Sequence, residues 1–353
     1  MMVTSTRGWA MDRQLSRVAA RQASRIQGAQ RRVHGVVQGV ILFFVALALL
    51  TTVGTSAYIG WSITHPARRV TDDSPARLKM TFDTVEFPSV GDRVTLRGWF
   101  IPAAASDQTV ILAHGYGGNR LEKAVDALDL AQALSGAGYN VLMFDFRNSG
   151  LSDGRLTTFG YRESDDILGA VRYLQGQHRE QSRHLAVMGF SMGGVAAARA
   201  AAEEPALEAV VMDSPYVDLP TYLDRNMKVW SGLPRVPFNW LVRSSLRILG
   251  RIPVNEVNTA SAIRDMSQPV LVLYGKGDTM SPAADREALA RAGGARVQIW
   301  EAPGSTPSWP SGVLPADSPA CYNLAGREAD SAQYDGQVIA FLKQHVGKQQ
   351  PAP

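Results

Sequence analysis

The stretch HLAVMGFSMGGVAAARAAA, residues 184–202, decides the fold. Its first part is a short apolar run that ends at Phe190, which predicts a buried strand, and its second part is a run of small helix-forming residues. Between the two lies GFSMG (189–193), with Ser191 at its centre. A Gly-x-Ser-x-Gly pattern on a strand–turn–helix presents its serine at the carboxyl edge of a sheet. So tight a turn leaves almost no room for side chains, which explains the glycines on either side.

Strand and helix signals alternate along the chain around this stretch. Strands are expected at 81–87, 94–101, 109–113, 140–146, 184–190, 209–213, 269–274 and 296–301, and helices at 119–137, 163–177, 192–204, 283–292 and 331–345. The first two strands look like a hairpin, and the others are separated by helices. This pattern predicts an α/β fold with a mostly parallel eight-stranded sheet covered by helices on both faces. Residues 216–262 interrupt the alternation and are expected to form a small helical cap.

A segment of 30 residues without a charge, 35–64, precedes this domain. About 20 apolar residues are enough to cross the hydrocarbon core of a bilayer as a helix. A buried core helix of this length would normally show a polar face, and a cleaved signal peptide usually has a short positive region, whereas 34 residues come before this run. We therefore expect an uncleaved transmembrane anchor, with the lipid bilayer as its partner.

The N-terminal tail, 1–34, carries seven arginines and one aspartate, a net charge of +6, while the rest of the chain sums to −2. Positive charge stays inside, so we expect a cytoplasmic tail and an extracytoplasmic main domain in the cell membrane. Arg13, Arg17, Arg21 and Arg25 recur every four residues on one helical face, which suits either anionic lipid or a solvated tail. A nucleic-acid partner is not expected, because the basic residues are not on the folded domain.

The remaining organisation follows from composition. Residues 65–80 are polar with two prolines and are expected to be a linker, 81–348 to be the main domain, and 349–353 to be a disordered tail. Cys321 is the single cysteine, which excludes an intrachain disulfide and a cysteine metal cluster. The sequence predicts neither a cofactor nor a metal.

Two further segments carry chemistry. HGYGG (114–118) directly follows the third expected strand, and such a loop supplies one backbone N–H to an oxyanion hole, while the residue after the nucleophile supplies the second. We assign these donors to Tyr116 and Met192. Asp278, just past the strand at 269–274, is the expected catalytic acid, and Asp213 at the end of the sixth strand is the alternative acid.

Five motifs in a fixed order, HGYGGNR (114–120), FDFRNSGLSDG (144–154), GFSMGG (189–194), DSPY (213–216) and YGKGDTMSP (274–282), resemble the α/β-hydrolase superfamily, most closely its bacterial membrane-anchored members. The resemblance covers residues 81–345. It implies that Ser191 is the nucleophile, that Asp278 is the acid, and that Tyr116 and Met192 are the oxyanion donors. It also implies a small-molecule acyl or peptide substrate.

The histidine of the expected triad is not evident. The chain has six histidines, His34, His65, His114, His178, His184 and His345, and none lies between Asp278 and His345. In the family the histidine follows the last strand. Here that place falls either at 305–307 or at Arg327, depending on how the prolines of the loop align, and arginine stays protonated.

Only His114 is expected at the same edge of the sheet as Ser191. It is a less favoured substitute base, because a residue in that place more often braces its loop. His178 and His184 lie at the opposite end of the strand that leads to Ser191, and His345 ends the last helix.

A serine without a base is normally a poor nucleophile. Loss of the histidine from such a triad costs about 10⁶ in turnover, while the oxyanion hole and substrate binding retain roughly 10³–10⁴ over water. The sequence therefore supports two hypotheses. The first is a membrane-anchored serine hydrolase, similar to carboxylesterases, lipases or peptidases, that acts on an ester, thioester or amide through Ser191. The alternative is a catalytically impaired, hydrolase-like binding or scaffold module.

Overall fold

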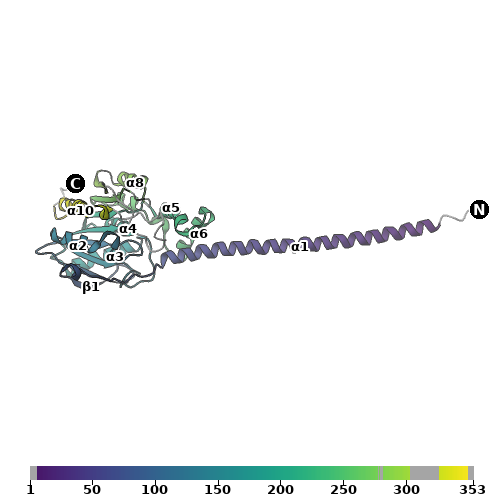
Figure 1. Cartoon of the computed structure of the whole chain (residues 1–353), viewed down its shortest axis with the longest axis horizontal. Coiled ribbons are helices and arrows are strands. Elements are labelled where there is room, and N and C mark those ends of the chain that lie inside the picture. Colours follow the sequence, from purple (N-terminus) through teal and green to yellow (C-terminus); the bar gives the residue numbers. More distant parts are fainter. Residues whose placement is uncertain (1–5, 277, 279–280, 303–325, 349–353) are drawn as a thin grey trace, which may run out of the picture. The chain divides into compact units, whose positions relative to one another are not determined.

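The computed structural model describes residues 6–276, 278, 281–302 and 326–348 (Figure 1). Its contacts divide the chain into two units, 1–55 and 56–353. From residue 6 onward, the first unit consists of a single helix, α1 (Thr6–Thr64). The last turns of this helix, 56–64, belong to the second unit. By length and composition, the part Leu15–Thr64 can cross a membrane, which makes it a candidate span.

The second unit is built on an eight-stranded sheet in the order β1-β2-β4-β3-β5-β6-β7-β8. The strands are β1 (Asp83–Pro88), β2 (Thr95–Ile101), β3 (Gln108–Ala113), β4 (Asn140–Asp145), β5 (His184–Phe190), β6 (Leu207–Asp213), β7 (Val270–Gly275) and β8 (Val297–Ala302). β2 pairs antiparallel with both β1 and β4, and every other neighbouring pair is parallel. The predicted α/β fold with a mostly parallel sheet is confirmed.

Helices cover both faces of this sheet (Figure 1). They are α2 (Ala127–Gly136), α3 (Glu163–Gln177), α4 (Met192–Glu203), α5 (Leu219–Ser231), α6 (Arg235–Ile248), α7 (Thr259–Asp265), α8 (Ala283–Gly293), α9 (Gly326–Ala329) and α10 (Ser331–His345), with 3₁₀ turns η1 (Pro75–Leu78), η2 (Lys123–Val125), η3 (Val254–Glu256) and η4 (Gly294–Arg296). One apolar core packs α3, α4, α7 and α8 against the sheet, and a second packs α2 and α10 against the other face. The two cores together bury both faces of the central strands, as is usual for a mostly parallel sheet.

Two details differ from the sequence prediction. A short turn at 102–107, rather than a helix, joins β2 to β3. The helix expected at 119–137 begins only at Ala127, because residues before it bind the loop backbone: the side-chain oxygen of Asn119 accepts a hydrogen bond from the amide of Leu121 at 3.0 Å. Glu122 and Asp126 have φ values of 30° and 44°, which a helix does not accommodate.

The segment expected as a linker, 65–80, packs on the domain. It includes η1, and Arg68 donates from Nη1 to the carbonyl oxygen of Ser152 at 2.6 Å. Leu78, Met80 and Phe82 pack against the apolar core that α2 and α10 cover. The connection from α1 to the sheet is therefore an ordered part of the domain.

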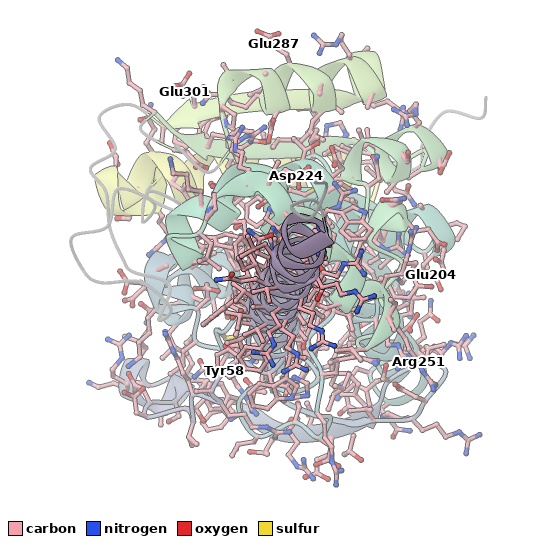
Figure 2. The ribbon with its side chains drawn as sticks, turned by 90° about the vertical axis from the view of Figure 1, so that its right-hand side faces the viewer. Tyr58, Glu204, Asp224, Arg251, Glu287 and Glu301 are labelled. Carbon is pink, nitrogen blue, oxygen red and sulfur yellow. The ribbon has the colours of Figure 1, made fainter. Side chains whose placement is uncertain are left out.

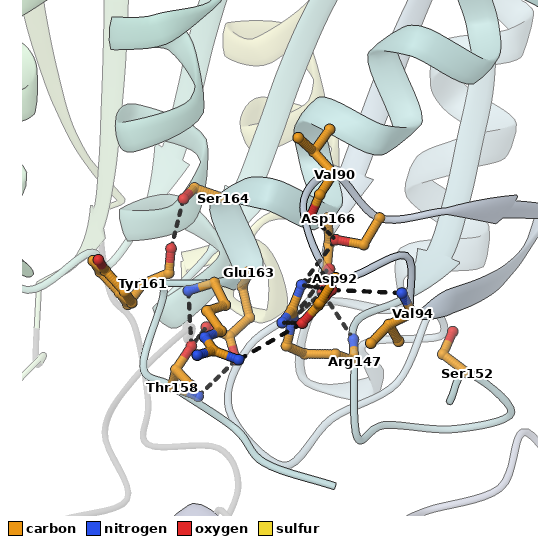
Figure 3. Close-up of polar contacts among 12 residues, drawn as sticks. Val90, Asp92, Val94, Arg147, Ser152, Thr158, Tyr161, Glu163, Ser164 and Asp166 are labelled. Carbon is orange, nitrogen blue, oxygen red and sulfur yellow. Dashed lines mark hydrogen bonds and ion pairs between the residues drawn. The ribbon is translucent and has the colours of Figure 1, made fainter. Parts of the chain in front are cut away.

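Buried ion pairs join the loops at the carboxyl edge of the sheet. Asp145, at the end of β4, accepts hydrogen bonds from the amide of Arg120 at 2.7 Å and from its guanidinium at 2.6 Å. Arg147, two residues on, donates to Asp166 of α3 at 2.7 Å and to Asp92 at 2.7 Å (Figure 3). These pairs connect the loop after β3 with the loop after β4, and that loop with α3.

We predict that Arg147→Met destabilises the fold by about 3–5 kcal/mol, because the fully buried carboxylate of Asp166 would lose its charged partner. Thermal or denaturant unfolding of the detergent-solubilised chain measures this loss. Arg291→Met, which removes an exposed pair with Glu287 on α8, is the matched control and should change stability little. Equal effects of the two substitutions would contradict the assigned role of Arg147.

Candidate active site

Ser191 lies on a strained turn between β5 and α4. Its backbone has φ 50° and ψ −111°, a conformation that non-glycine residues rarely adopt. The two glycines of the pattern allow this turn: a Cβ atom on Gly189 would lie 2.2 Å from the carbonyl oxygen of Gly193, and one on Gly193 would lie 2.1 Å from that of Ala113. The structure thus has the sharp strand-to-helix turn that the motif predicts.

The loop after β3 lies beside Ser191, because β3 and β5 are parallel neighbours with Ala113 opposite Gly189. Tyr116 belongs to this loop, and Met192 is the first, buried residue of α4. The first backbone N–H groups of a helix have no partner within the helix, so Met192 is well placed as a donor. The structure therefore brings the two expected oxyanion donors to the same edge of the sheet.

The side chain of Tyr116 ties this loop to the end of α1. Its hydroxyl donates to the carbonyl oxygen of Ile63 at 2.7 Å, and its ring stacks on Phe159 with centroids 5.5 Å apart. Phe159 is held in turn by Glu163, whose buried carboxylate accepts hydrogen bonds from the amides of Thr158 at 2.7 Å and Gly160 at 2.8 Å (Figure 3). The position of Tyr116 is therefore set by a chain of contacts from α3 to α1.

Glu122 is a site residue that the sequence reasoning missed. It is buried below the loop, and its Oε2 atom accepts a hydrogen bond from the amide of Gly115 at 2.6 Å. Burial raises the pKa of this carboxyl group, although the amides of Gly115 and Ala124 counteract the shift. In the sequence, Glu122 is distinguished only by its position seven residues after Gly115, and this spacing does not by itself predict a contact between the two.

His114 has both ring nitrogens engaged. The amide of Phe146 donates to Nε2 at 3.0 Å, so Nδ1 carries the proton that is donated to the carbonyl oxygen of Gly115 at 2.7 Å. Burial lowers the pKa of His114, which keeps the ring neutral. This geometry favours a brace for the loop over the role of substitute base.

The two candidate acids have different surroundings. Asp278 is buried beyond the carboxyl end of β7, and its Oδ1 atom accepts a hydrogen bond from the amide of Ser281 at 3.0 Å. Asp213, at the end of β6, accepts hydrogen bonds from the hydroxyl of Tyr334 at 2.6 Å and from that of Ser214 at 2.9 Å. Asp213 thus serves to join β6 to α10, which favours Asp278 as the acid.

Arg327, one of the two positions considered for the triad histidine, has a structural role. Its guanidinium binds both carboxylate oxygens of Asp335 at 2.8 Å and donates to the carbonyl oxygen of Val125 at 3.0 Å. It therefore joins the start of α10 to the turn before α2. The other position, 305–307, lies outside the described residues.

The other histidines bind elsewhere. His184 pairs with Glu208 at 2.7 Å, and His178 stacks on Phe100. His65 stacks on Trp61, His345 lies against Phe341, and His34 contacts the carbonyl of Gln30. Within the described ranges, no group of three or more His, Cys, Asp or Glu side chains is arranged to hold a metal ion.

An apolar cluster lies over the helix that follows Ser191. It contains Val195, one turn into α4, together with Leu219 and Leu223 of α5 and Val242 of α6. Ile63 of α1 belongs to the same cluster. The region expected as a helical cap, 216–262, contains α5, α6, η3 and the start of α7. Apolar side chains of α5 and α6 pack against Val195, near the turn at Ser191.

We predict that Gly193→Ala prevents correct folding or lowers stability by several kcal/mol, because the added methyl would overlap the backbone of β3. Unfolding midpoints and the yield of folded protein measure the effect. Gly176→Ala in α3, where a Cβ atom meets nothing within 4 Å, is the matched control and should raise stability by about 0.5–1 kcal/mol. A well-folded Gly193→Ala variant would contradict the tight turn.

We also predict a pH-dependent effect at Asp213, because burial raises its pKa to about 6. An unfolded aspartate has a pKa of about 3.9, so ionised Asp213 costs the folded state about 3 kcal/mol above pH 6 and nothing below pH 4. Asp213→Asn removes this titration. Its stability relative to the natural chain should therefore rise by that amount between pH 4 and pH 7, and a constant difference across this range would contradict the prediction.

Comparison with known proteins agrees with this geometry. The family model described as serine aminopeptidase, S33 matches residues 104–268, just under half of the chain. The chain is 30% identical over 203 residues to an uncharacterised protein of Mycobacterium tuberculosis, which is 57% of this chain and 64% of that protein. It is 29% identical over 140 residues to the acyltransferase drtE of Aspergillus calidoustus, which is 39% of this chain and 44% of the relative. The chain thus spans less than two thirds of the length of these curated relatives.

Among solved structures, an esterase of Pyrococcus furiosus is similar over 81% of this chain and 99% of its own, with a TM-score of 0.65 and 27% sequence identity. The sheet order, the turn at Ser191 and the loop after β3 are the features by which such a fold is recognised. On this fold and these similarities, the chain belongs to the α/β-hydrolase superfamily.

Proposed function

We propose that this protein is a membrane-anchored serine hydrolase that transfers the acyl group of an ester, thioester or amide through Ser191. The observation that carries the proposal is the backbone of Ser191, held at φ 50° between two glycines that admit no side chain. Such strain persists only where the surrounding structure enforces it, and it is typical of a functional position. The names of similar proteins, an esterase and an acyltransferase, agree with acyl chemistry.

In this proposal Ser191 attacks the carbonyl carbon of the substrate and gives its proton to water, and the amides of Tyr116 and Met192 stabilise the oxyanion that forms. The bond to the leaving alcohol, thiol or amine then breaks, the leaving group takes a proton from water, and a second water hydrolyses the acyl ester of Ser191. Asp278 is the acid of the site. No histidine that could take the proton from Ser191 lies between Asp278 and His345, the part of the chain where the family's triad histidine falls. We therefore expect slow turnover in comparison with a complete triad, with acceleration mainly from the oxyanion hole and substrate binding.

The location at a membrane is also part of the proposal. The candidate span Leu15–Thr64 carries the uncharged segment 35–64, and the arginines before it favour a cytoplasmic N-terminus. The main domain would then lie outside the cytoplasm. The apolar character of the cap helices α5 and α6, which pack over Val195 of α4, agrees with a substrate that carries an acyl or aryl group.

The alternative function is a binding or scaffold module that keeps the pocket without turnover. Two histidines favour this alternative, because their rings are engaged in structural contacts rather than placed to accept a proton from Ser191. His114 braces its loop, and His184 pairs with Glu208. The strained turn at Ser191 favours the enzyme, because a module that only binds has no need of a serine held in a strained conformation.

Fluorophosphonate labelling separates the two functions. We predict that the full chain, purified in detergent, is labelled covalently at Ser191, more slowly than a complete triad, because the oxyanion hole stabilises attack on the probe while the serine lacks a histidine base. Labelling is read by gel fluorescence and by mass spectrometry of the modified peptide.

Ser191→Ala should abolish the labelling, whereas Ser244→Ala on α6, whose hydroxyl binds the carbonyl oxygen of Trp240, should not change it. If the folded natural chain is not labelled, the enzyme proposal is wrong and the binding module is favoured.

A further inference from the structure

The last turns of α1 are part of the main domain. Ser56, Gly60 and Ile63 are buried on one side of the helix, while Tyr58 and Trp61 are exposed on the other. The buried side packs on α6: a Cβ atom on Gly60 would lie 1.9 Å from the hydroxyl oxygen of Ser245, and that hydroxyl donates to the carbonyl oxygen of Ser56 at 3.4 Å. So close an approach joins α6 firmly to these turns.

Helix geometry sets the height of these turns relative to a bilayer. The uncharged segment 35–64 has 30 residues, so as a helix it is about 45 Å long, whereas the hydrocarbon core is about 30 Å thick. The excess places roughly its last ten residues in the headgroup region if the segment starts at the cytoplasmic boundary. Tyr58 and Trp61 fit this level, because aromatic side chains of this kind gather at membrane interfaces. α6, which contacts Ser56 and Gly60, lies at the same level.

The outer side of α6 has the composition of a surface that binds lipid. Asn239, Val242 and Leu246 face the domain, but Val236 is 83% exposed and Trp240 is 70% exposed. Ile248 and Leu249, at the end of the helix, are exposed as well. Trp240 lies five residues before Ser245, which is about 7–8 Å along the helix from the contact with α1.

Basic side chains surround these apolar ones. The exposed residues Arg235, Arg247 and Arg251 lie at the two ends of α6. Figure 2 views the domain from the side on which α5 and α6 lie in Figure 1, and it labels Tyr58 and Arg251. Aromatic and aliphatic side chains flanked by arginine are typical of helices that lie in the interface of an anionic bilayer.

We propose that the outer side of α6, with Trp240 at its centre, inserts into the headgroup region of the membrane that holds α1. This inference rests on the proposed anchor. Its consequence for function is that the cap over Ser191 is held at the bilayer surface. The helices α5 and α6, which enclose the buried apolar cluster with Ile63, then lie beside a source of acyl chains, so the substrate class is a lipid-like ester rather than a soluble peptide.

The test uses the full chain in vesicles of equal parts phosphatidylcholine and phosphatidylglycerol. Cys321 is replaced by alanine, which leaves one introduced cysteine to carry an environment-sensitive fluorophore. Labels are placed by Trp240→Cys on α6, by Glu287→Cys on the exposed surface of α8 as the matched control, and by Val45→Cys in the candidate span. We expect lipid-borne quenchers to reduce the fluorescence of the labels at 240 and 45 and aqueous iodide to quench only the label at 287.

The outcomes separate the two proposals. If the label at 45 is quenched from the lipid and the label at 240 is quenched by iodide, α6 does not dock and the inference is wrong, although the anchor stands. If the label at 45 is also quenched by iodide, the anchor itself is wrong, and the docking of α6 beside it is overturned as well. Lipid quenching of the label at 287 equal to that at 240 would contradict a specific role of α6.

Discussion

The contact of backbone with backbone at the turn after β5 is the constraint on which the site depends. Gly193 lies so close to the carbonyl oxygen of Ala113 that the start of α4 rests on the end of β3 without any side chain between them. This contact holds Ser191 in its strained conformation and sets its distance from the loop that carries Tyr116. A larger residue at Gly189 or Gly193 would push the start of α4 away from the end of β3, and Ser191 away from the loop that carries Tyr116.

Buried polar contacts hold the loops around this turn. Arg120 with Asp145 connects the loop after β3 to the end of β4, and Arg147 with Asp166 connects the loop after β4 to α3. Glu122 binds the amide of Gly115. Breaking such a pair leaves a buried charge without a partner, which is strongly destabilising. These pairs therefore hold the loops in fixed positions. The same need explains why His114, the less favoured substitute base, and Arg327, one of the two positions where the family's histidine would fall, are engaged in structural contacts.

Much of the fold was predictable, and the site only in part. Strands, helices and the turn at Ser191 follow from local patterns of apolar residues and glycines, so α3 and α10 agree with their predicted ranges at both ends. The start of α2 was placed too early, because Asn119 binds the loop backbone. Glu122 was missed because a buried carboxylate has no local pattern that distinguishes it from a solvated one.

By itself, the sequence determined the α/β class, the position of the candidate nucleophile and the absence of a histidine between Asp278 and His345, since each depends on residue type and spacing alone. Only the tertiary structure decided that Asp213 binds Tyr334, that the segment 65–80 packs on the domain and that Tyr116 is tied to Ile63 of α1. The residues of the pair Tyr116–Ile63 are 53 positions apart in the chain, and those of the pair Asp213–Tyr334 are 121 apart. Their partners are chosen by packing in three dimensions, which the local pattern of the sequence does not encode.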